Sequence, residues 1–214
     1  MKLSALQVGV DVPWVTSWTA EAITGVAPCA SVGGRLALGQ LDHAGYGKPQ
    51  YSKNHLLRQR LTVARMLCPM CGEPTAPDDR VTQVARRIPA GLLRKGGRAP
   101  GLTPTIEDDR ILIDAGSIAP LHRRCSELSL QHCPHLRADP NIDVRPFTPR
   151  WMILPLMIDA TLPPPPGHAL MRTRAEAAIV PVITFLQLCG VSDERDPGWK
   201  RHAARYRQGS RVPA

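Results

Sequence analysis

The sequence contains no apolar run long enough to cross a lipid bilayer. The most apolar stretch, residues 177–188, contains Pro181 and Gln187 and is shorter than the roughly 20 residues that a membrane helix needs. Residues 1–12 carry one lysine and no apolar run followed by a small-residue cleavage site, so they do not match a secretory signal peptide. We therefore expect a soluble, cytoplasmic protein with no membrane partner.

Aromatic residues are also scarce, at 4% of 214 residues, whereas prolines number 22. Proline interrupts helices and central strands, so this composition predicts short elements and irregular segments. The hydrophobic fraction of 43% is ordinary for a globular protein, and a buried core can still form.

Motifs of common catalytic sites are missing. The chain has neither the His-Glu-x-x-His pattern of zinc hydrolases nor the glycine spacing of phosphate-binding loops. Residues 72–121 contain no histidine, although an HNH-type nuclease needs a histidine base between its two zinc-ligand pairs. Asp108 and Asp109 could bind a divalent ion, but a solvated turn is the simpler interpretation. These absences favour a non-enzymatic protein and leave a zinc-containing nuclease as the weakest alternative.

Cysteine and histidine do occur at metal-ligand spacing. Cys68 and Cys71 form a Cys-x-x-Cys turn, and Gly72 can supply the left-handed backbone that such a turn needs. His122 and Cys125 lie three residues apart at the start of an expected helix, where both can face one ion. Because zinc prefers thiolate and imidazole ligands, the pattern predicts one structural zinc ion.

The other three cysteines have no partner at this spacing. Cys133 lies eight residues beyond Cys125, which in a continuous helix is about 12 Å along the axis. It would replace His122 as the fourth ligand only if the helix broke early. Cys29 and Cys189 are expected to be buried free thiols, since nothing points to a disulfide-forming compartment.

Hydrophobic periodicity predicts the secondary structure around the ligands. In the expected helix before Cys68, Leu57, Leu61 and Ala64 would form the buried side. Helices are expected at residues 53–67, from about 122 to 133 and at 171–188, and β-branched residues predict strands at 81–88 and 110–113.

A Cys-x-x-Cys knuckle, a β-hairpin and a helix carrying the second ligand pair resemble the treble-clef class of zinc fingers, over residues 68–136 with a long hairpin insertion. Arg58-Gln59-Arg60, the knuckle, the second pair and Cys133-Pro134-His135-Leu136 also resemble a group of uncharacterised bacterial and phage proteins. That group often has a cysteine where this chain has His122, and the resemblance implies no activity. If the chain is phage-encoded, the virion is an alternative location.

The predicted fold is therefore α+β, with a small treble-clef-like zinc core wrapped by N- and C-terminal extensions. We expect residues 1–214 to form a single compact unit. Its parts would be the zinc core at about 53–137, an apolar extension at 138–191 and a basic tail at 192–214.

Positive charge is unevenly distributed in a chain of net charge +9. Between residues 53 and 98, ten basic residues face three acidic ones, which would attract a phosphate backbone without reading bases. The candidate nucleic-acid-binding residues are Arg58, Arg65, Arg86, Arg87, Arg94, Lys95 and Arg98.

The alternative partner is another protein. The proline run at 163–166 and the apolar segment 151–158 could dock on it, which would make the chain an interaction or virion-assembly component. We favour packing of segments 151–158 and 177–188 on each other and on residues 1–50. The leading expectation is a zinc-stabilised, nucleic-acid-binding accessory protein.

Overall fold

The computed structural model describes residues 2–84, 86–96, 101–114, 119–162, 178–199 and 201. Helices and strands are both present, with more strand than helix, so the fold is α+β. In chain order the elements are β1 (Thr16–Trp18), β2 (Ile23–Pro28), the 3-10 helix η1 (Ala30–Val32), β3 (Leu36–Gln40), β4 (Pro49–Asn54), α1 (Leu56–Arg65), β5 (Arg80–Val84), β6 (Arg86–Pro89), α2 (Ala90–Lys95), β7 (Arg110–Asp114), β8 (Leu121–His122), α3 (Arg123–His132), α4 (Pro134–Ala138), β9 (Asp143–Pro146), β10 (Trp151–Leu162) and β11 (Ala178–Arg195).

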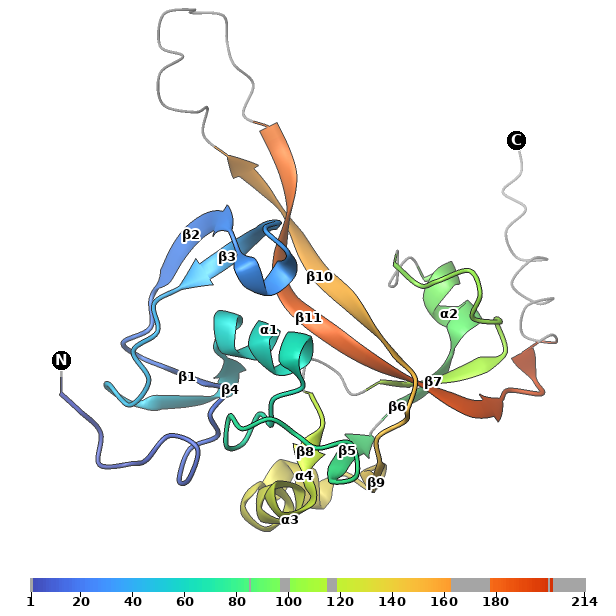
Figure 1. The fold of residues 1–214 in the computed structure, drawn as a ribbon, viewed down its shortest axis with the longest axis horizontal. Coiled ribbons are helices and arrows are strands. Elements are labelled where there is room, and N and C mark those ends of the chain that lie inside the picture. Colours follow the sequence, from blue (N-terminus) through green and yellow to red (C-terminus); the bar gives the residue numbers. More distant parts are fainter. Residues whose placement is uncertain are drawn as a thin grey trace, which may run out of the picture.

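The long strand β11 organises the largest sheet, which has six strands (Figure 1). β10 runs antiparallel to β11 from the Trp151–Gly190 pair to the Leu162–Ala178 pair. On the other edge of β11, β3 pairs at Ile183 and β7 pairs from Cys189 onward. Two smaller sheets are formed by β1 with β4 and by β8, β5 and β9.

Helix α1 covers the stretch of β11 that lies between β3 and β7. The Gln59 side chain accepts a hydrogen bond from the Leu186 N–H (3.0 Å) and donates to the Leu186 carbonyl (2.6 Å). Arg60 donates to the Thr184 carbonyl at 2.8 Å. Two polar helix side chains therefore replace the hydrogen bonds that a neighbouring strand would have made, which satisfies buried backbone groups.

Apolar side chains fill both faces of this sheet. On one side Val63 and Met66 of the α1 region pack on Ile183, Leu186 and Leu188. On the other side Ala90 of α2 and Leu112 of β7 pack on Leu154 and Cys189. A third cluster consists of Cys68, Val81, Leu121 and Cys125. Its last three members belong to β5, β8 and α3, which lie below α1 in Figure 1.

The structure corrects the expected helix at 171–188. Residues 178–188 belong to strand β11, while residues 171–177 and the proline run at 163–166 lie outside the described residues. The segment is rich in β-branched residues, which suit a pleated strand: Ile179, Val180, Val182 and Ile183. Its antiparallel partner β10 supplies the backbone hydrogen bonds, and a pattern within the segment itself does not reveal that partner. Segments 151–158 and 178–188 do pair with each other, and β11 also meets β3 from the N-terminal region.

Two further expectations need revision. The strand expected at 81–88 is two strands in different sheets, because β5 pairs with β8 and β9 whereas β6 pairs with β7. Helix α1 forms where expected, but its buried residues include Arg58, Gln59 and Arg60, while Ala64 is exposed and Leu57 and Leu61 are only partly buried. The buried side of α1 thus combines polar residues with Leu56 and Val63. No helix in the described part of the chain is long and apolar enough to span a membrane.

Candidate metal centre

The first half of the site is a tight turn between α1 and β5. Met66 ends α1 in the left-handed conformation (φ 52°) and turns the chain towards Cys68. The Cys68 N–H donates to the Glu73 carbonyl (2.7 Å), and the Gly72 N–H donates to the Cys68 carbonyl (2.8 Å). Gly72 has φ 83°, and an added Cβ would lie 2.9 Å from the Trp14 ring, so glycine is required there twice over.

The N-terminal region holds this turn from outside. The Trp14 N–H donates to the Met70 carbonyl (2.8 Å), and the Val15 N–H donates to the Pro69 carbonyl (3.0 Å). The two residues between Cys68 and Cys71 are thereby fixed by a segment more than fifty positions away. The knuckle is part of the folded body rather than a free loop.

The second half comes from β8 and the first turn of α3. Antiparallel pairing of Arg80 with His122 and of Val81 with Leu121 brings β8 alongside β5. His122 is the residue before α3, and Cys125 is buried in the first turn of that helix. One strand pair therefore delivers the second ligand pair to the first.

Four potential ligand atoms converge at this point. The Sγ atoms of Cys68, Cys71 and Cys125 and a ring nitrogen of His122 all lie within 4.8 Å of one another. His122 Nδ1 is 3.4 Å from the Cys71 sulfur and 3.8 Å from the Cys125 sulfur. In a tetrahedral zinc site, metal–sulfur distances of about 2.3 Å and metal–nitrogen distances of about 2.0–2.1 Å place S and N about 3.6 Å apart. The Cys3His set therefore fits one zinc ion in both chemistry and spacing.

The His122 ring is already oriented for coordination through Nδ1. Its other nitrogen, Nε2, lies 3.1 Å from the Pro74 carbonyl, which can only accept. Nε2 therefore carries the proton and Nδ1 presents its lone pair towards the three sulfurs. A backbone carbonyl that fixes the tautomer of a histidine ligand is a common feature of zinc sites.

Without a cation, this cluster disfavours charged thiolates. Burial, together with the neighbouring Cys68 and Cys71, raises the pKa of Cys125 to about 12. Burial and Cys68 also raise the pKa of Cys71, against a hydrogen bond from the Glu73 backbone. A divalent ion reverses this balance because its charge favours thiolates. Metal binding must then release protons, so affinity should fall as the pH is lowered.

Cys133 is not a member of the cluster. It ends α3 and precedes α4, so the helix does not break early enough for it to replace His122. Within the described residues, no cysteine forms a disulfide. Cys189 is buried as expected, whereas Cys29 is only half-buried.

A second group of potential ligands, Glu21, Asp42 and His55, is explained without a metal. Arg58 donates to the Glu21 carboxylate and to the Asp42 carboxylate, each at 2.8 Å. The His55 nitrogens are both engaged: Nδ1 accepts from the Arg58 N–H, and Nε2 lies 2.9 Å from the Leu41 carbonyl. The guanidinium thus takes the position that a cation would need. Burial, the largest influence, lowers the pKa of His55 and keeps the ring neutral.

Arg58 was a candidate nucleic-acid-binding residue, but it is only 1% exposed and cannot contact a phosphate backbone. Arg87 pairs with Glu194, and Arg94 pairs with Asp108. Arg65, Arg86 and Lys95 are exposed, on three different elements, and Arg98 lies outside the described residues. Of the six candidates in the described part of the chain, one is therefore buried and two are ion-paired. No sequence pattern predicts this network, since Glu21 and Asp42 lie 37 and 16 positions from Arg58.

Cys29 has an unusual environment among the free thiols. Burial raises the pKa of the Cys29 thiol. Hydrogen bonds from the side chain and backbone of Ser31 and the charge of Arg60 lower this pKa by more, so the net shift is downward. The Cys29 sulfur lies 3.1 Å from the Ser31 hydroxyl and 3.8 Å from the Arg60 guanidinium.

A lowered pKa means more thiolate at neutral pH, so alkylation of Cys29 by iodoacetamide should begin at lower pH than in Ser31→Ala. Mass spectrometry of peptides labelled across a pH series measures this, with Cys133 in the same sample as an internal reference for reagent activity. An unchanged pH profile in Ser31→Ala would show that the hydroxyl does not stabilise the thiolate.

Comparisons with protein-family models, curated proteins and solved structures find no significant match for this chain. Two observations therefore support a metal centre: the four converging ligand atoms and the hydrogen bond that orients His122.

Proposed function

We propose that Cys68, Cys71, His122 and Cys125 hold a structural zinc ion and that the protein is a non-enzymatic, zinc-stabilised binding protein. The observation that carries this proposal is the closed Cys3His set, which leaves no coordination position for a substrate. The pairing of β5 with β8 directly before α3 supports a treble-clef arrangement of knuckle, hairpin and helix, with residues 85–120 as the insertion. Asp108 and Asp109, the acidic pair that could bind a divalent ion, instead form ion pairs with Arg94 and Arg195.

Nucleic acid is the proposed partner. The net charge of +9 supports it, as does a set of exposed arginines close to the metal ligands along the chain. Arg123 and Arg124 lie between His122 and Cys125, and Arg65 precedes the knuckle; none of the three pairs with a carboxylate among the described residues. The ion would thus stiffen the elements that present these cations to phosphate.

Binding to duplex DNA should weaken steeply with salt, by roughly a hundredfold between 50 and 200 mM if about four phosphates are contacted. The double variant Arg123→Gln/Arg124→Gln should lower the slope of log K against log salt by about 2. Arg35→Gln, an exposed arginine on the distant β2–β3 turn, is the matched control and should leave the slope unchanged. Fluorescence anisotropy measures all three, and absence of binding at low salt would remove nucleic acid as the partner.

A specific observation also favours the second candidate, a protein partner in an interaction or virion-assembly role. β10 pairs only with β11 among the described strands, and Ile153, Met157 and Ile158 on it are 41%, 46% and 47% exposed. Apolar side chains along an open strand edge are typical of protein-binding surfaces. Salt-insensitive association with a host protein, lost in Ile153→Lys, would support this candidate over nucleic acid.

A further inference from the structure

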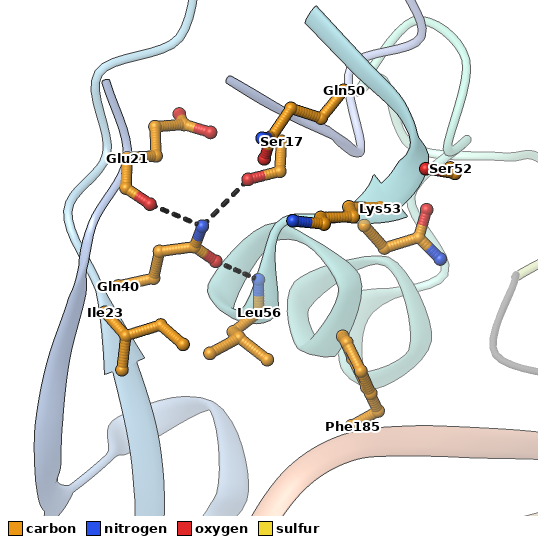
Figure 2. Close-up of a pocket in the computed structure, with 10 residues that line it drawn as sticks. Ser17, Glu21, Ile23, Gln40, Gln50, Ser52, Lys53, Leu56 and Phe185 are labelled. Atoms are coloured by element: carbon orange, nitrogen blue, oxygen red, sulfur yellow. Dashed lines mark hydrogen bonds between the residues drawn. The ribbon is translucent and has the colours of Figure 1, made fainter. Parts of the chain in front are cut away.

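A cavity of about 450 Å³, whose lining contains none of the four clustered cysteine and histidine residues, lies among β1, β4, the start of α1 and β11 (Figure 2). This volume falls within the range of small-molecule sites. Nothing in the proposed zinc or nucleic-acid function uses it. Its lining is mixed, with hydroxyl, amide and ammonium groups on one side and aliphatic and aromatic groups on the other.

The floor of the cavity is held rigidly. The Gln40 amide donates to the Ser17 hydroxyl (2.8 Å) and to the Glu21 carbonyl (2.8 Å), and its oxygen accepts from the Leu56 N–H (2.9 Å). These bonds, drawn as dashed lines in Figure 2, use both the NH2 group and the oxygen of the Gln40 amide. They also fix the Ser17 oxygen as an acceptor from Gln40.

The Ser17 hydroxyl is one of the polar groups that line this floor. Ser17 is 2% exposed, and its oxygen accepts a hydrogen bond from the Gln40 amide at 2.8 Å. Figure 2 shows this hydroxyl on the cavity side of β1, next to the Gln50 amide. Because the Ser17 oxygen accepts from Gln40, its O–H can donate to a ligand oxygen that reaches this position.

The lining contains one cationic side chain, Lys53. The Lys53 ammonium points into the cavity in Figure 2 and makes no ion pair with a described residue. The Glu21 carboxylate is turned away and is already bound by Arg58 (2.8 Å) and by the Trp18 N–H (2.7 Å). An anion entering the cavity would therefore meet a cation without meeting a free carboxylate.

The opposite wall is apolar. Leu56 is buried at the start of α1, Phe185 extends from β11, and Ile23 is 62% exposed at the rim. A ligand that satisfies both walls must carry an anionic oxygen group at one end and a compact apolar body at the other.

We propose that this cavity binds a small organic anion, a carboxylate or phosphate monoester with an aromatic or branched aliphatic body. Lys53 and the Ser17 hydroxyl contact the anionic oxygens, and Leu56 and Phe185 contact the body. The site is independent of the metal centre and of any nucleic-acid surface.

Calorimetric titration of the full chain with phenylacetate, phenyl phosphate and the neutral phenylacetamide tests this proposal. At least one anion should bind saturably and at least tenfold more tightly than the amide, since a charge-assisted hydrogen bond contributes about 1.5–3 kcal/mol. Preference for phenyl phosphate or for phenylacetate identifies the headgroup that the cavity takes.

Lys53→Met should weaken binding of the preferred anion about tenfold or more, and Ser17→Ala should weaken it severalfold. Lys48→Met, an exposed lysine outside the lining, is the control and should bind as the native protein does. Because Lys53 is exposed, its variant should fold normally, which circular dichroism verifies. Equal binding of the amide, unchanged binding in Lys53→Met, or no saturable binding of any probe would each overturn the proposal.

Discussion

Cys68→Ser is expected to lower the stability of the folded protein sharply. Cys68 is fully buried, and its sulfur belongs to the four-atom ligand set. Structural zinc contributes about 10–16 kcal/mol to small zinc domains, whereas whole domains are stable by only about 5–15 kcal/mol. Weakening the site should therefore lower the free energy of unfolding by at least ~3 kcal/mol, measured by urea denaturation followed by circular dichroism.

Cys133→Ser is the matched control for this change. It makes the same substitution on a half-buried cysteine at the end of α3, outside the ligand set. Its free energy of unfolding should stay within about 1 kcal/mol of the native value. Equal destabilisation by both substitutions would show that Cys68 matters for packing alone.

Arg58→Met is expected to cost about 3–5 kcal/mol, because it leaves a charge buried without its partner. The Glu21 side chain is fully buried, and Arg58 binds it as well as Asp42 and the Thr16 carbonyl. Thermal or urea denaturation measures the loss. Arg65→Met on the same helix removes an exposed arginine and should change stability by less than about 0.5 kcal/mol.

The double variant Glu21→Gln/Arg58→Met separates the buried charge from packing. If the unpaired carboxylate causes the loss, neutralising Glu21 should restore part of the stability that Arg58→Met removes. Destabilisation that is simply additive would contradict this explanation and point to lost side-chain packing instead.

The members of the Cys/His cluster are predictable from sequence because their spacing is local. Cys68 and Cys71 define a turn, and His122 and Cys125 define the start of a helix, so each pair is fixed within four residues. Only their meeting in space required the structure, through the pairing of β5 with β8. The histidine tautomer was beyond sequence reasoning, since it depends on the Pro74 carbonyl.

The errors arose where distant residues decide the local environment. The periodicity of α1 pointed its leucines inward, yet the carboxylate of Glu21 and the open edge of β11 draw Arg58, Gln59 and Arg60 into the interior. Likewise, β11 is a strand because β10 lies beside it, and a long apolar run does not reveal that partner. Both cases are tertiary interactions overriding a local pattern.

The zinc content of the folded protein decides whether the Cys/His cluster is a metal centre. Protein prepared with zinc and freed of loosely bound metal should contain one zinc ion per chain by elemental analysis. The ion should persist in Cys133→Ser and be lost from Cys125→Ser. Native protein that is cooperatively folded and contains no zinc would contradict the account.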